Sequence, residues 1–112
     1  MNSADSLITV SIGFGNAAEA EAVAWELVER RLAACAQVWP MRSVYRRQGV
    51  VEEANEIMLL AKTTAAALPA VGALVLESHS YEVPEIVAQP IQWATEVYAQ
   101  WIRESVDGVS GR

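Results

Sequence analysis

The sequence predicts an α+β fold: a ferredoxin-like βαββαβ sandwich with an added C-terminal helix and a long hairpin between its second and third strands. Two observations predict it. Extended and helical segments follow one another in the order strand, helix, strand, strand, helix, strand, helix. Because strand–helix–strand crossovers are right-handed, both halves of such a chain place their helices on the same face of one sheet.

The first strand and the first helix are expected at residues 7–14 and 17–31. From Leu7 to Phe14, apolar and small or polar residues alternate with a period of two, which is typical of a strand. From Ala17 to Arg31 the apolar period becomes helical, and Asn16 is a suitable N-cap before it. Trp25 projects off the apolar stripe, so it either contacts something other than its own sheet or lies flat on its own helix.

The second and third strands form the long hairpin. Ala33–Trp39 is small and apolar, Pro40 bounds it, and Arg42–Tyr45 continues in extended form. Gln48-Gly49 is the expected turn before the next strand. Glu56–Thr63 is a continuous apolar run with a charge near each end, which is typical of a strand covered on both faces. A hairpin that outgrows its sheet has unpaired edges, and such edges favour pairing between chains.

The second helix is expected to be capped by Thr63 or Thr64 and to run through Leu76, with an irregular start because of Pro69. The remaining elements are a strand from Glu85 to Ile91 and a helix capped by Thr95 and closed by Asp107-Gly108.

Composition predicts a single domain over residues 1–112, with an ordered core from about 7 to 106, that forms oligomers. The chain has 112 residues in one uninterrupted pattern, so one domain is expected. Its hydrophobic fraction of 53% and its four tryptophans exceed what one small core can bury. Excess apolar surface is usually covered by another subunit.

Charge and cysteine content exclude several classes of partner. The net charge of −6 argues against a nucleic-acid partner, because phosphates attract basic surfaces. The longest apolar stretch, Ala65–Leu76, contains Pro69 and Gly72 and is too short to span a bilayer, so no membrane association is expected. A lone cysteine, Cys35, fits a reducing compartment, and residues 1–7 do not resemble an export signal, so the predicted location is cytoplasmic.

The connection from Glu77 to Ile91 is the candidate functional site. It holds the only histidine, His79, followed by Tyr81, Glu82 and Glu85, and Pro84 favours an extended chain before the last strand. Polar loops between rigid elements often carry function. Imidazole and thiolate suit copper, with carboxylates as further ligands, although the spacing fits no known intrachain metal motif. Without a metal, His79 would cap or pack against its helix and Cys35 would be a small buried hydrophobe.

Several segments in register resemble the CutA divalent-cation tolerance family. They are ERRLAACAQV (29–38), SVYRRQGVVEEANEIMLLAKTT (43–64), HSYEVPEI (79–86) and YAQWIRESV (98–106). The resemblance runs in order over nearly the whole chain, from about residue 7 to 106. It implies a ferredoxin-like protomer, a tight homotrimer in which long hairpins pair between neighbours, and tolerance to copper and other divalent cations without catalysis. It also implies copper binding near the cysteine and the histidine–tyrosine loop, with Cys35, His79 and Glu85 as ligands. The positions that match the family pattern are Cys35, Tyr45, Gly49, Glu53, Lys62, Thr63, His79, Tyr81, Pro84 and Glu85.

The chain departs from the family pattern in three places. The family commonly has a proline where this chain has Ser80, so a less rigid loop is expected. It commonly has aromatic residues where this chain has Arg46 and Arg47, which changes the hairpin surface. Some relatives have a further cysteine in the first strand, where this chain has Ser11 and Ile12, so one possible soft ligand is missing.

Three other functions compete with metal binding. A trimeric small-ligand sensor like the PII-type signalling proteins would share the protomer topology, but no basic cluster in a flexible loop suits nucleotide phosphates. An enzyme would use His79 with Glu82 or Glu85 as acid and base, yet no nucleophile or oxyanion site is evident beside them. A trimeric scaffold without any ligand is the third alternative.

Overall fold

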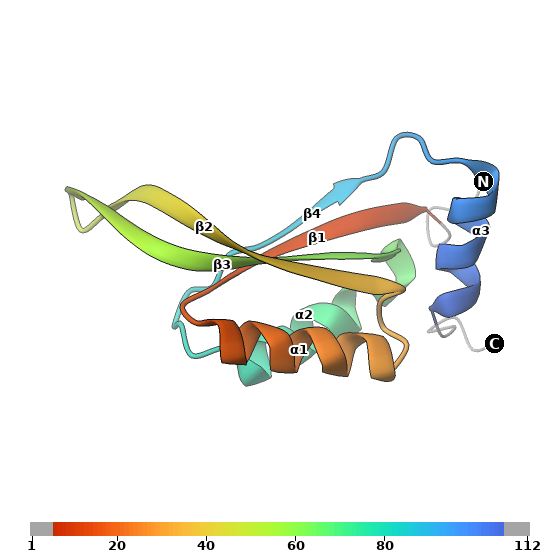
Figure 1. The fold of residues 1–112 in the computed structure, drawn as a ribbon, viewed down its shortest axis with the longest axis horizontal. Coiled ribbons are helices and arrows are strands. Elements are labelled where there is room, and N and C mark those ends of the chain that lie inside the picture. Colours follow the sequence, from red (N-terminus) through yellow and green to blue (C-terminus); the bar gives the residue numbers. More distant parts are fainter. Residues whose placement is uncertain (1–5, 107–112) are drawn as a thin grey trace.

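The computed structural model describes residues 6–106, and the chain folds into four strands and three α-helices in that range (Figure 1). The elements follow in the order β1 (Leu7–Phe14), α1 (Ala17–Glu29), β2 (Cys35–Arg47), β3 (Val50–Thr64), the 3₁₀ turn η2 (Ala65–Ala67), α2 (Leu68–Ser78), β4 (Ile86–Pro90) and α3 (Glu96–Ser105). This is the predicted βαββαβ order with the added C-terminal helix.

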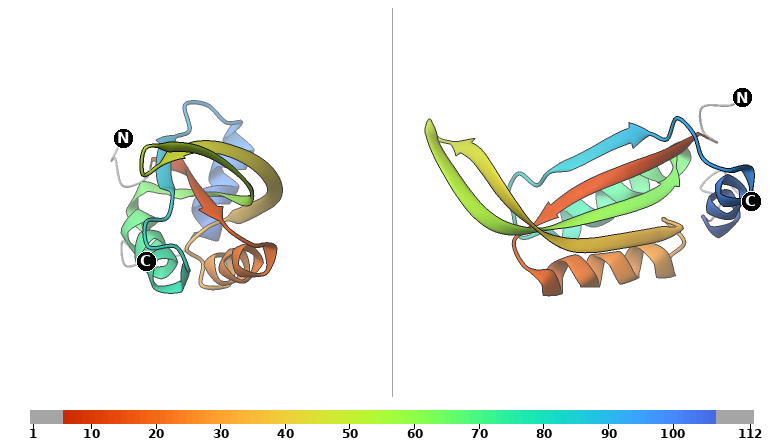
Figure 2. Two further views of the ribbon diagram at one scale, coloured as in Figure 1. Left: turned by 90° about the vertical axis from the view of Figure 1, so that its left-hand side faces the viewer. Right: turned by 45° about the horizontal axis from the view of Figure 1, so that its top comes forward.

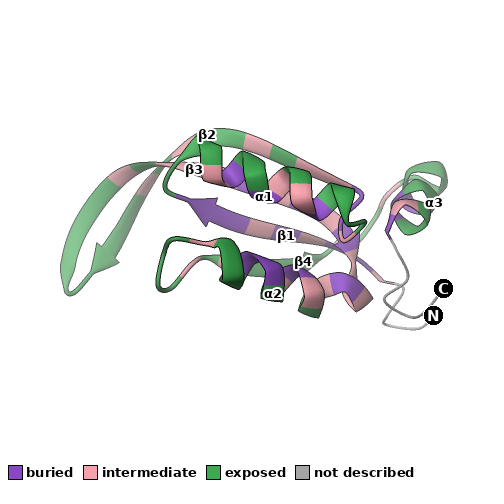
Figure 3. Cartoon of the chain, turned by 90° about the horizontal axis from the view of Figure 1, so that it is seen from below, coloured by how far each residue is buried: buried purple, intermediate pink, exposed green. Residues whose placement is uncertain are grey.

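The four strands form one antiparallel sheet in the order β2-β3-β1-β4. Helices α1 and α2 lie side by side on one face of this sheet, and α3 lies at the end where β1 begins (Figures 1 and 3). The central strand β1 pairs with β3 from Leu7↔Thr64 to Phe14↔Ile57, and with β4 on its other edge. The ferredoxin-like prediction is therefore confirmed.

The core lies between the sheet and the two helices. Period-two alternation turns Val10, Ile12 and Phe14 of β1 toward the helices, where each is fully buried. Helix α1 contributes Ala20, Val23 and Leu27, and α2 contributes Val71, Leu74 and Val75. These residues are spaced three or four apart, which puts each set on one helix face.

Both ends of helix α1 are closed by hydrogen bonds of the residues that flank it. Asn16 accepts a hydrogen bond from the Glu19 amide at 2.8 Å, which confirms it as the N-cap. The helix ends at Glu29, two residues earlier than predicted, because Arg31 takes a left-handed conformation with φ of 60°. The Leu32 amide then bonds back to the Leu27 carbonyl at 2.8 Å, which closes a Schellman-type end.

The β2–β3 hairpin extends beyond the rest of the sheet (Figures 1 and 2). Strand β1 ends at Phe14, opposite Ile57, so residues 50–56 of β3 pair only with β2. The predicted turn is confirmed: Gln48 and Gly49 have φ of 51° and 83°, the two positive values of a type I′ turn. In the hairpin's overhang, defined here as residues 41–56, one edge of β3 has no neighbouring strand within the described chain.

Two expectations about the hairpin strands need correction. Strand β2 does not break at Pro40; it runs from Cys35 to Arg47, because an edge strand tolerates a residue without an amide hydrogen. The apolar run of β3 is not covered on both faces. Leu59 is fully buried against the helices, whereas Met58 and Leu60 on the opposite face are only half-buried.

The second helix starts irregularly, as Pro69 predicts, with the 3₁₀ turn before it and Pro69 in its first turn. Neither threonine caps it through its side chain, contrary to expectation. Thr64 makes no capping bond, and the buried Thr63 hydroxyl donates to the Leu32 carbonyl at 2.7 Å. Helix α2 ends at Ser78, two residues later than predicted, and His79 is its C-cap.

Helix α3 is capped as predicted, because the Thr95 hydroxyl accepts from the Tyr98 amide at 3.4 Å. Ala99 and Ile102 turn its buried face to the end of the sheet. A residue just after α1 binds the C-terminal end of α3: the Arg31 guanidinium donates to the Glu104 carbonyl at 2.7 Å. The predicted stop at Asp107-Gly108 lies outside the described residues.

Candidate functional site

The loop between α2 and β4, residues 79–85, lies at the end of the sheet where β1 ends and the overhang begins (Figure 1). His79 anchors this loop. Its side chain is fully buried and stacks on Phe14, with ring centroids 4.4 Å apart and planes 10° apart. Nε2 lies 2.6 Å from the Gly13 carbonyl oxygen, and Nδ1 accepts from the Tyr81 amide at 3.0 Å.

These two bonds indicate the tautomer of the neutral His79 ring. A carbonyl oxygen only accepts, so Nε2 carries the proton, and Nδ1 uses its lone pair on the Tyr81 amide. A Glu19 carboxylate oxygen lies 3.6 Å from Nδ1. Because neither nitrogen has a free lone pair, His79 could bind a metal ion only after the Tyr81 amide leaves Nδ1. The ring's hydrogen bonds go to Gly13 and Tyr81, and the carboxylate within 4 Å of it is that of Glu19, and not that of Glu82 or Glu85, its candidate partners in acid–base catalysis.

Ser80 fixes the loop through two hydrogen bonds. Its amide and its hydroxyl both donate to the same Glu19 carboxylate oxygen, at 3.0 and 3.1 Å. A proline at this position has no amide hydrogen and no hydroxyl, so it could form neither bond. Ser80 therefore ties the loop to α1 by contacts that the usual family residue lacks.

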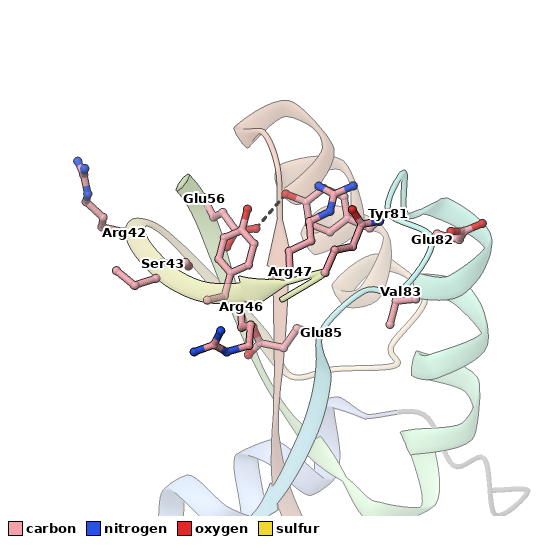
Figure 4. Close-up of a pocket in the computed structure, with 13 residues that line it drawn as sticks. Arg42, Ser43, Arg46, Arg47, Glu56, Tyr81, Glu82, Val83 and Glu85 are labelled. Atoms are coloured by element: carbon pink, nitrogen blue, oxygen red, sulfur yellow. Dashed lines mark hydrogen bonds between the residues drawn. The ribbon is translucent and has the colours of Figure 1, made fainter. Parts of the chain in front are cut away.

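Tyr81 turns back over the end of β1. Its hydroxyl donates to the Glu56 carboxylate at 2.9 Å (Figure 4). The centroid of its ring lies 4.9 Å from that of the His79 ring. Burial, together with the bond to the Glu56 carboxylate, raises the pKa of Tyr81 to about 12. The hydroxyl therefore stays protonated at neutral pH and acts as a hydrogen-bond donor, not as a phenolate ligand.

Two glycines make room for the loop. A Cβ at Gly15 would lie 2.9 Å from the Tyr81 hydroxyl oxygen, and a Cβ at Gly13 would lie 3.2 Å from a Glu85 carboxylate oxygen. The Gly13 amide also donates to the Glu85 carbonyl at 3.3 Å. Glu85 thus lies over the buried end of β1, although it is itself exposed, as is Glu82, and Pro84 is half-buried where the chain approaches β4.

Cys35 lies at the other end of the sheet. It starts β2, directly opposite Lys62, and its Sγ is 3.9 Å from the Tyr98 hydroxyl of α3. The residue is half-exposed at the start of the edge strand β2, so the expectation of a buried hydrophobe is wrong. Burial and the contact with Cys35 raise the pKa of Tyr98. Lys62 donates to the Gln37 side chain at 2.6 Å.

Three candidate residues belong to the overhang. Tyr45 lies opposite Glu52 in β2, Glu53 forms an ion pair with Arg42, and Gly49 occupies the turn, where its carbonyl accepts from Arg46 at 3.0 Å. They stabilise the hairpin or line its surface. Thr63 holds the chain after α1 from within the core.

An open groove of about 990 Å³ lies between the overhang and the loop (Figure 4). Residues 42–47 of β2 and Gln48 of the turn form one wall, and residues 81–83 and Glu85 form the other. Gly13 and Glu56 also line it. His79 lies behind Tyr81 and does not line the groove.

The three expected metal ligands do not come together in one chain. His79 and Glu85 both contact Gly13, whereas Cys35 lies beside Lys62, which pairs with Thr9. The four residue-to-residue steps from Thr9 to Gly13 separate these positions by about 13 Å along the strand. Within residues 6–106, no group of three or more histidine, cysteine, aspartate or glutamate side chains is placed to hold a metal ion.

Sequence reasoning missed the residues that position this loop: Gly13, Gly15, Glu19 and Glu56. Each belongs to an element or turn that the sequence does predict, but its contact with the loop depends on how those elements pack. The two glycines in three residues at the end of the first strand are the one available signal, since glycine there often marks a close approach of other groups.

Comparison with known protein families gives one match that covers most of the chain. Residues 8–105 match the family model described as CutA1 divalent ion tolerance protein. The chain is 47% identical over 87 residues to the divalent-cation tolerance protein CutA of Thermus thermophilus, covering 77% of this chain and 84% of that protein. It is 37% identical to human Protein CutA over 92 residues, but spans only 51% of that protein and similar shares of its mouse and bovine counterparts.

Solved structures agree with this match. The divalent cation tolerance protein of Thermus thermophilus superposes with a TM-score of 0.87 at 42% identity, covering 90% of this chain and 99% of that one. A CutA from Archaeoglobus fulgidus, described as a periplasmic divalent cation tolerance protein, gives a TM-score of 0.87 at 33% identity with the same coverage. In the described part of the chain, no helix has the length and apolar character needed to cross a bilayer.

Proposed function

The chain belongs to the CutA1 divalent ion tolerance family, and on this premise we propose that it is a homotrimeric tolerance protein that binds copper or a similar divalent cation and catalyses no reaction. The family names describe ion tolerance and no reaction. The single observation that carries the proposal from family to mechanism is the overhanging hairpin.

The overhang supports assembly through its backbone and its side chains. Backbone groups along one edge of β3 between residues 50 and 56 have no strand beside them in the described chain, and such edges pair readily. Val44, Val50 and Val51 expose 70%, 58% and 60% of their surface there. A strand of a neighbouring chain would form hydrogen bonds with these backbone groups, and its side chains would cover the three valines. Three chains arranged in a ring leave no such edge unpaired.

Assembly would also bring together metal ligands that lie apart in one chain. One chain separates Cys35 from His79 and Glu85, so an ion bound by these side chains would need donors from more than one chain, or water. Glu85 has no side-chain partner within residues 6–106, and the Cys35 thiol is half-exposed, so both have free lone pairs. His79 would contribute only by exchanging its bond with the Tyr81 amide for the metal. Copper is the favoured ion because thiolate and imidazole are soft ligands.

Two measurements test this function together. Light scattering coupled to gel filtration should give three times the chain mass. Competition between the protein and a chelator for Cu(II) should give about one ion per chain, with affinity lowered about tenfold in Cys35→Ser, His79→Gln or Glu85→Gln. Glu29→Gln, which changes an exposed carboxylate at the end of α1, is the control. A monomer, or copper affinity equal in all four variants, would contradict the proposal.

We also place the protein in the cytoplasm, because a chain with a single cysteine forms no internal disulfide and is compatible with a reducing compartment. The Archaeoglobus fulgidus relative is described as periplasmic. Fractionation of cells with antibody detection distinguishes the two locations, and recovery in the periplasmic fraction would overturn the assignment.

A further inference from the structure

Trp25 projects from the outer side of α1. The buried face of this helix is formed by Ala20, Val23 and Leu27, and Trp25 is two positions from Val23, which is about 200° around the helix. Trp25 is 75% exposed, whereas a ring lying flat on its own helix would have one face covered. Within residues 6–106 it stacks on no other ring and lies against no cation. Of the two roles considered for Trp25 from the sequence, the structure excludes packing on its own helix.

Carboxylates lie one helical turn away on each side of Trp25. Glu21 and Glu29 come four positions before and after it, so they are its neighbours on the same face of α1. Both are exposed, and neither side chain forms a hydrogen bond or ion pair within residues 6–106. At 1.5 Å per residue, the two positions are about 12 Å apart along the helix axis. One apolar ring therefore lies between two unneutralised charges of the same sign.

Short side chains surround the indole on the same face. Ala18 and Ala22, seven and three positions before Trp25, are exposed, and Val28, three positions after it, exposes 41% of its surface. An alanine has no atoms beyond its Cβ, so a second helix can approach α1 closely beside the ring. This outer side of a single helix is convex, and it therefore suits the surface of a partner and not an enclosed small molecule.

The assembly proposed above leaves this face uncovered. The overhang bends toward the side of the sheet away from the helices (Figures 1 and 2). Helix α1 lies on the other face of the sheet, and its outer surface is turned away from the sheet (Figure 3). Chains that pair along the overhang therefore do not need the surface around Trp25.

Charge decides which kind of partner fits. Helix α1 contains four glutamates and no basic residue, and the whole chain has a net charge of −6. Nucleic acids and anionic lipid surfaces would be repelled. A second copy packed α1 against α1 would bring its own Glu21 and Glu29 close to those of the first copy, and like charges repel. A lysine or arginine side chain, in contrast, would pair with either carboxylate and is attracted to the face of an indole ring.

We propose that the outer face of α1, residues 18–29, docks a basic amphipathic helix of another protein. An apolar side chain of the partner lies on Trp25. Basic side chains eight positions apart on the partner reach Glu21 and Glu29, because that spacing gives the same separation of about 12 Å on any α-helix. This docking is separate from ion tolerance, since it uses none of the candidate metal ligands and needs no metal ion.

The probe is a fluorescein-labelled synthetic helix of about 18 residues, a length at which an alanine-rich peptide is helical on its own. One face carries two lysines eight positions apart with a leucine midway between them. A second peptide of the same composition places the lysines on opposite faces. Both are titrated with the protein in its native assembly, with EDTA present, and anisotropy is measured. The first peptide should bind saturably, and the second about fivefold more weakly, as expected for the loss of one exposed ion pair.

Variants assign the binding to this face of α1. Trp25→Ala should weaken binding of the first peptide at least tenfold, because a central tryptophan usually contributes much of the affinity of an interface. The variant should fold normally, since the ring is exposed. Glu21→Gln combined with Glu29→Gln should weaken binding about fivefold. Glu77→Gln combined with Glu96→Gln is the matched control, because it removes two exposed carboxylates from other helices, and it should change the affinity by less than about twofold.

The proposal is overturned if the first peptide shows no saturable binding up to about 1 mM, or if Trp25→Ala binds it as tightly as the parent does. It is also overturned if the control pair weakens binding as much as the pair on α1, because a general attraction of lysine to an acidic protein would behave in that way. Light scattering tests a second copy as the occupant. If the parent forms larger assemblies than Trp25→Ala at the same concentration, this face binds another copy of the chain and the proposal fails.

Discussion

His79 joins the end of α2 to the end of β1: its Nε2 lies 2.6 Å from the carbonyl oxygen of Gly13. That carbonyl belongs to a buried residue next to Phe14, on which the imidazole stacks. The same ring accepts the Tyr81 amide through Nδ1. One buried side chain therefore links a helix, the central strand and the loop that forms a wall of the groove.

His79→Ala should lower the free energy of unfolding by about 3 kcal/mol, because it removes a buried ring and leaves the Gly13 carbonyl without its donor. Urea denaturation followed by circular dichroism measures the change. Glu77→Ala, an exposed substitution in the last turn of α2, should change stability by less than about 0.5 kcal/mol. Equal midpoints for the two variants would mean that the imidazole contributes little to the fold.

Gly15→Ala should displace Tyr81, because the new Cβ would lie 2.9 and 3.1 Å from two atoms of that side chain. We expect the bond between Tyr81 and Glu56 to be lost and the pKa of Tyr81 to fall from about 12 toward its ordinary value of 10.0. Ultraviolet titration of the tyrosines measures this shift. Gly72→Ala is the matched control, since a Cβ there meets nothing within 4 Å, and alanine favours a helix interior by up to about 1 kcal/mol.

The raised pKa of Tyr81 also predicts how the free energy of unfolding changes with pH in the alkaline range. Its pKa is raised in the folded protein, so its contribution is fully present below pH 10, the ordinary value, and is lost as the pH rises toward about 12. Tyr81→Phe should therefore flatten the fall in stability within this window. The raised pKa of Tyr98 acts in the same direction and remains in the variant, so the fall becomes shallower without vanishing. Denaturation midpoints at a series of pH values provide the test, and parallel profiles would count against it.

The turn of the hairpin gives a prediction about assembly. Gly49 has φ of 83°, and a β-branched residue pays roughly 1–2 kcal/mol to adopt such a conformation. Gly49→Val should lower the melting temperature and, through the overhang, promote dissociation on dilution. Gly49→Asn should be close to the parent, because asparagine tolerates positive φ. Light scattering over a dilution series compares the two variants. If Gly49→Val stays assembled at every concentration, the conformation of the turn does not contribute to the association of subunits.

Much of the fold could be predicted because local chemistry and periodicity specify it. The Asn16 and Thr95 caps, the Gln48-Gly49 turn and the irregular start at Pro69 depend on neighbouring residues alone, and all are confirmed. The continuity of β2 through Pro40 could not be predicted in this way. It depends on β2 being an edge strand, and the position of a strand in its sheet is a property of the whole topology.

The candidate site was predictable only in outline. The sequence indicates that the connection after α2 carries polar groups, but not that His79 is buried with both nitrogens bonded, because Gly13 and Phe14 lie 66 and 65 positions away along the chain. The groove depends on the curvature of a hairpin and the path of a loop. Arg46 and Arg47, noted in the sequence as departures from the family pattern, both line this groove.

Arg31 provides the last prediction, because it combines an unfavourable backbone with a favourable side-chain bond. Its φ of 60° strains any residue with a Cβ, and its guanidinium donates to the Glu104 carbonyl at the end of α3. Arg31→Ala keeps the strain and loses the bond, so it should destabilise by about 1 kcal/mol, whereas Arg31→Gly also relieves the strain and should recover most of that loss. Hydrogen exchange should show faster exchange of α3 amides in both variants, since both lose the bond. Arg30→Ala removes only an exposed ion pair with Glu26 and should leave α3 exchange unchanged. Faster exchange in Arg30→Ala alone, or none in either Arg31 variant, would show that α3 is held by its apolar face and not by Arg31.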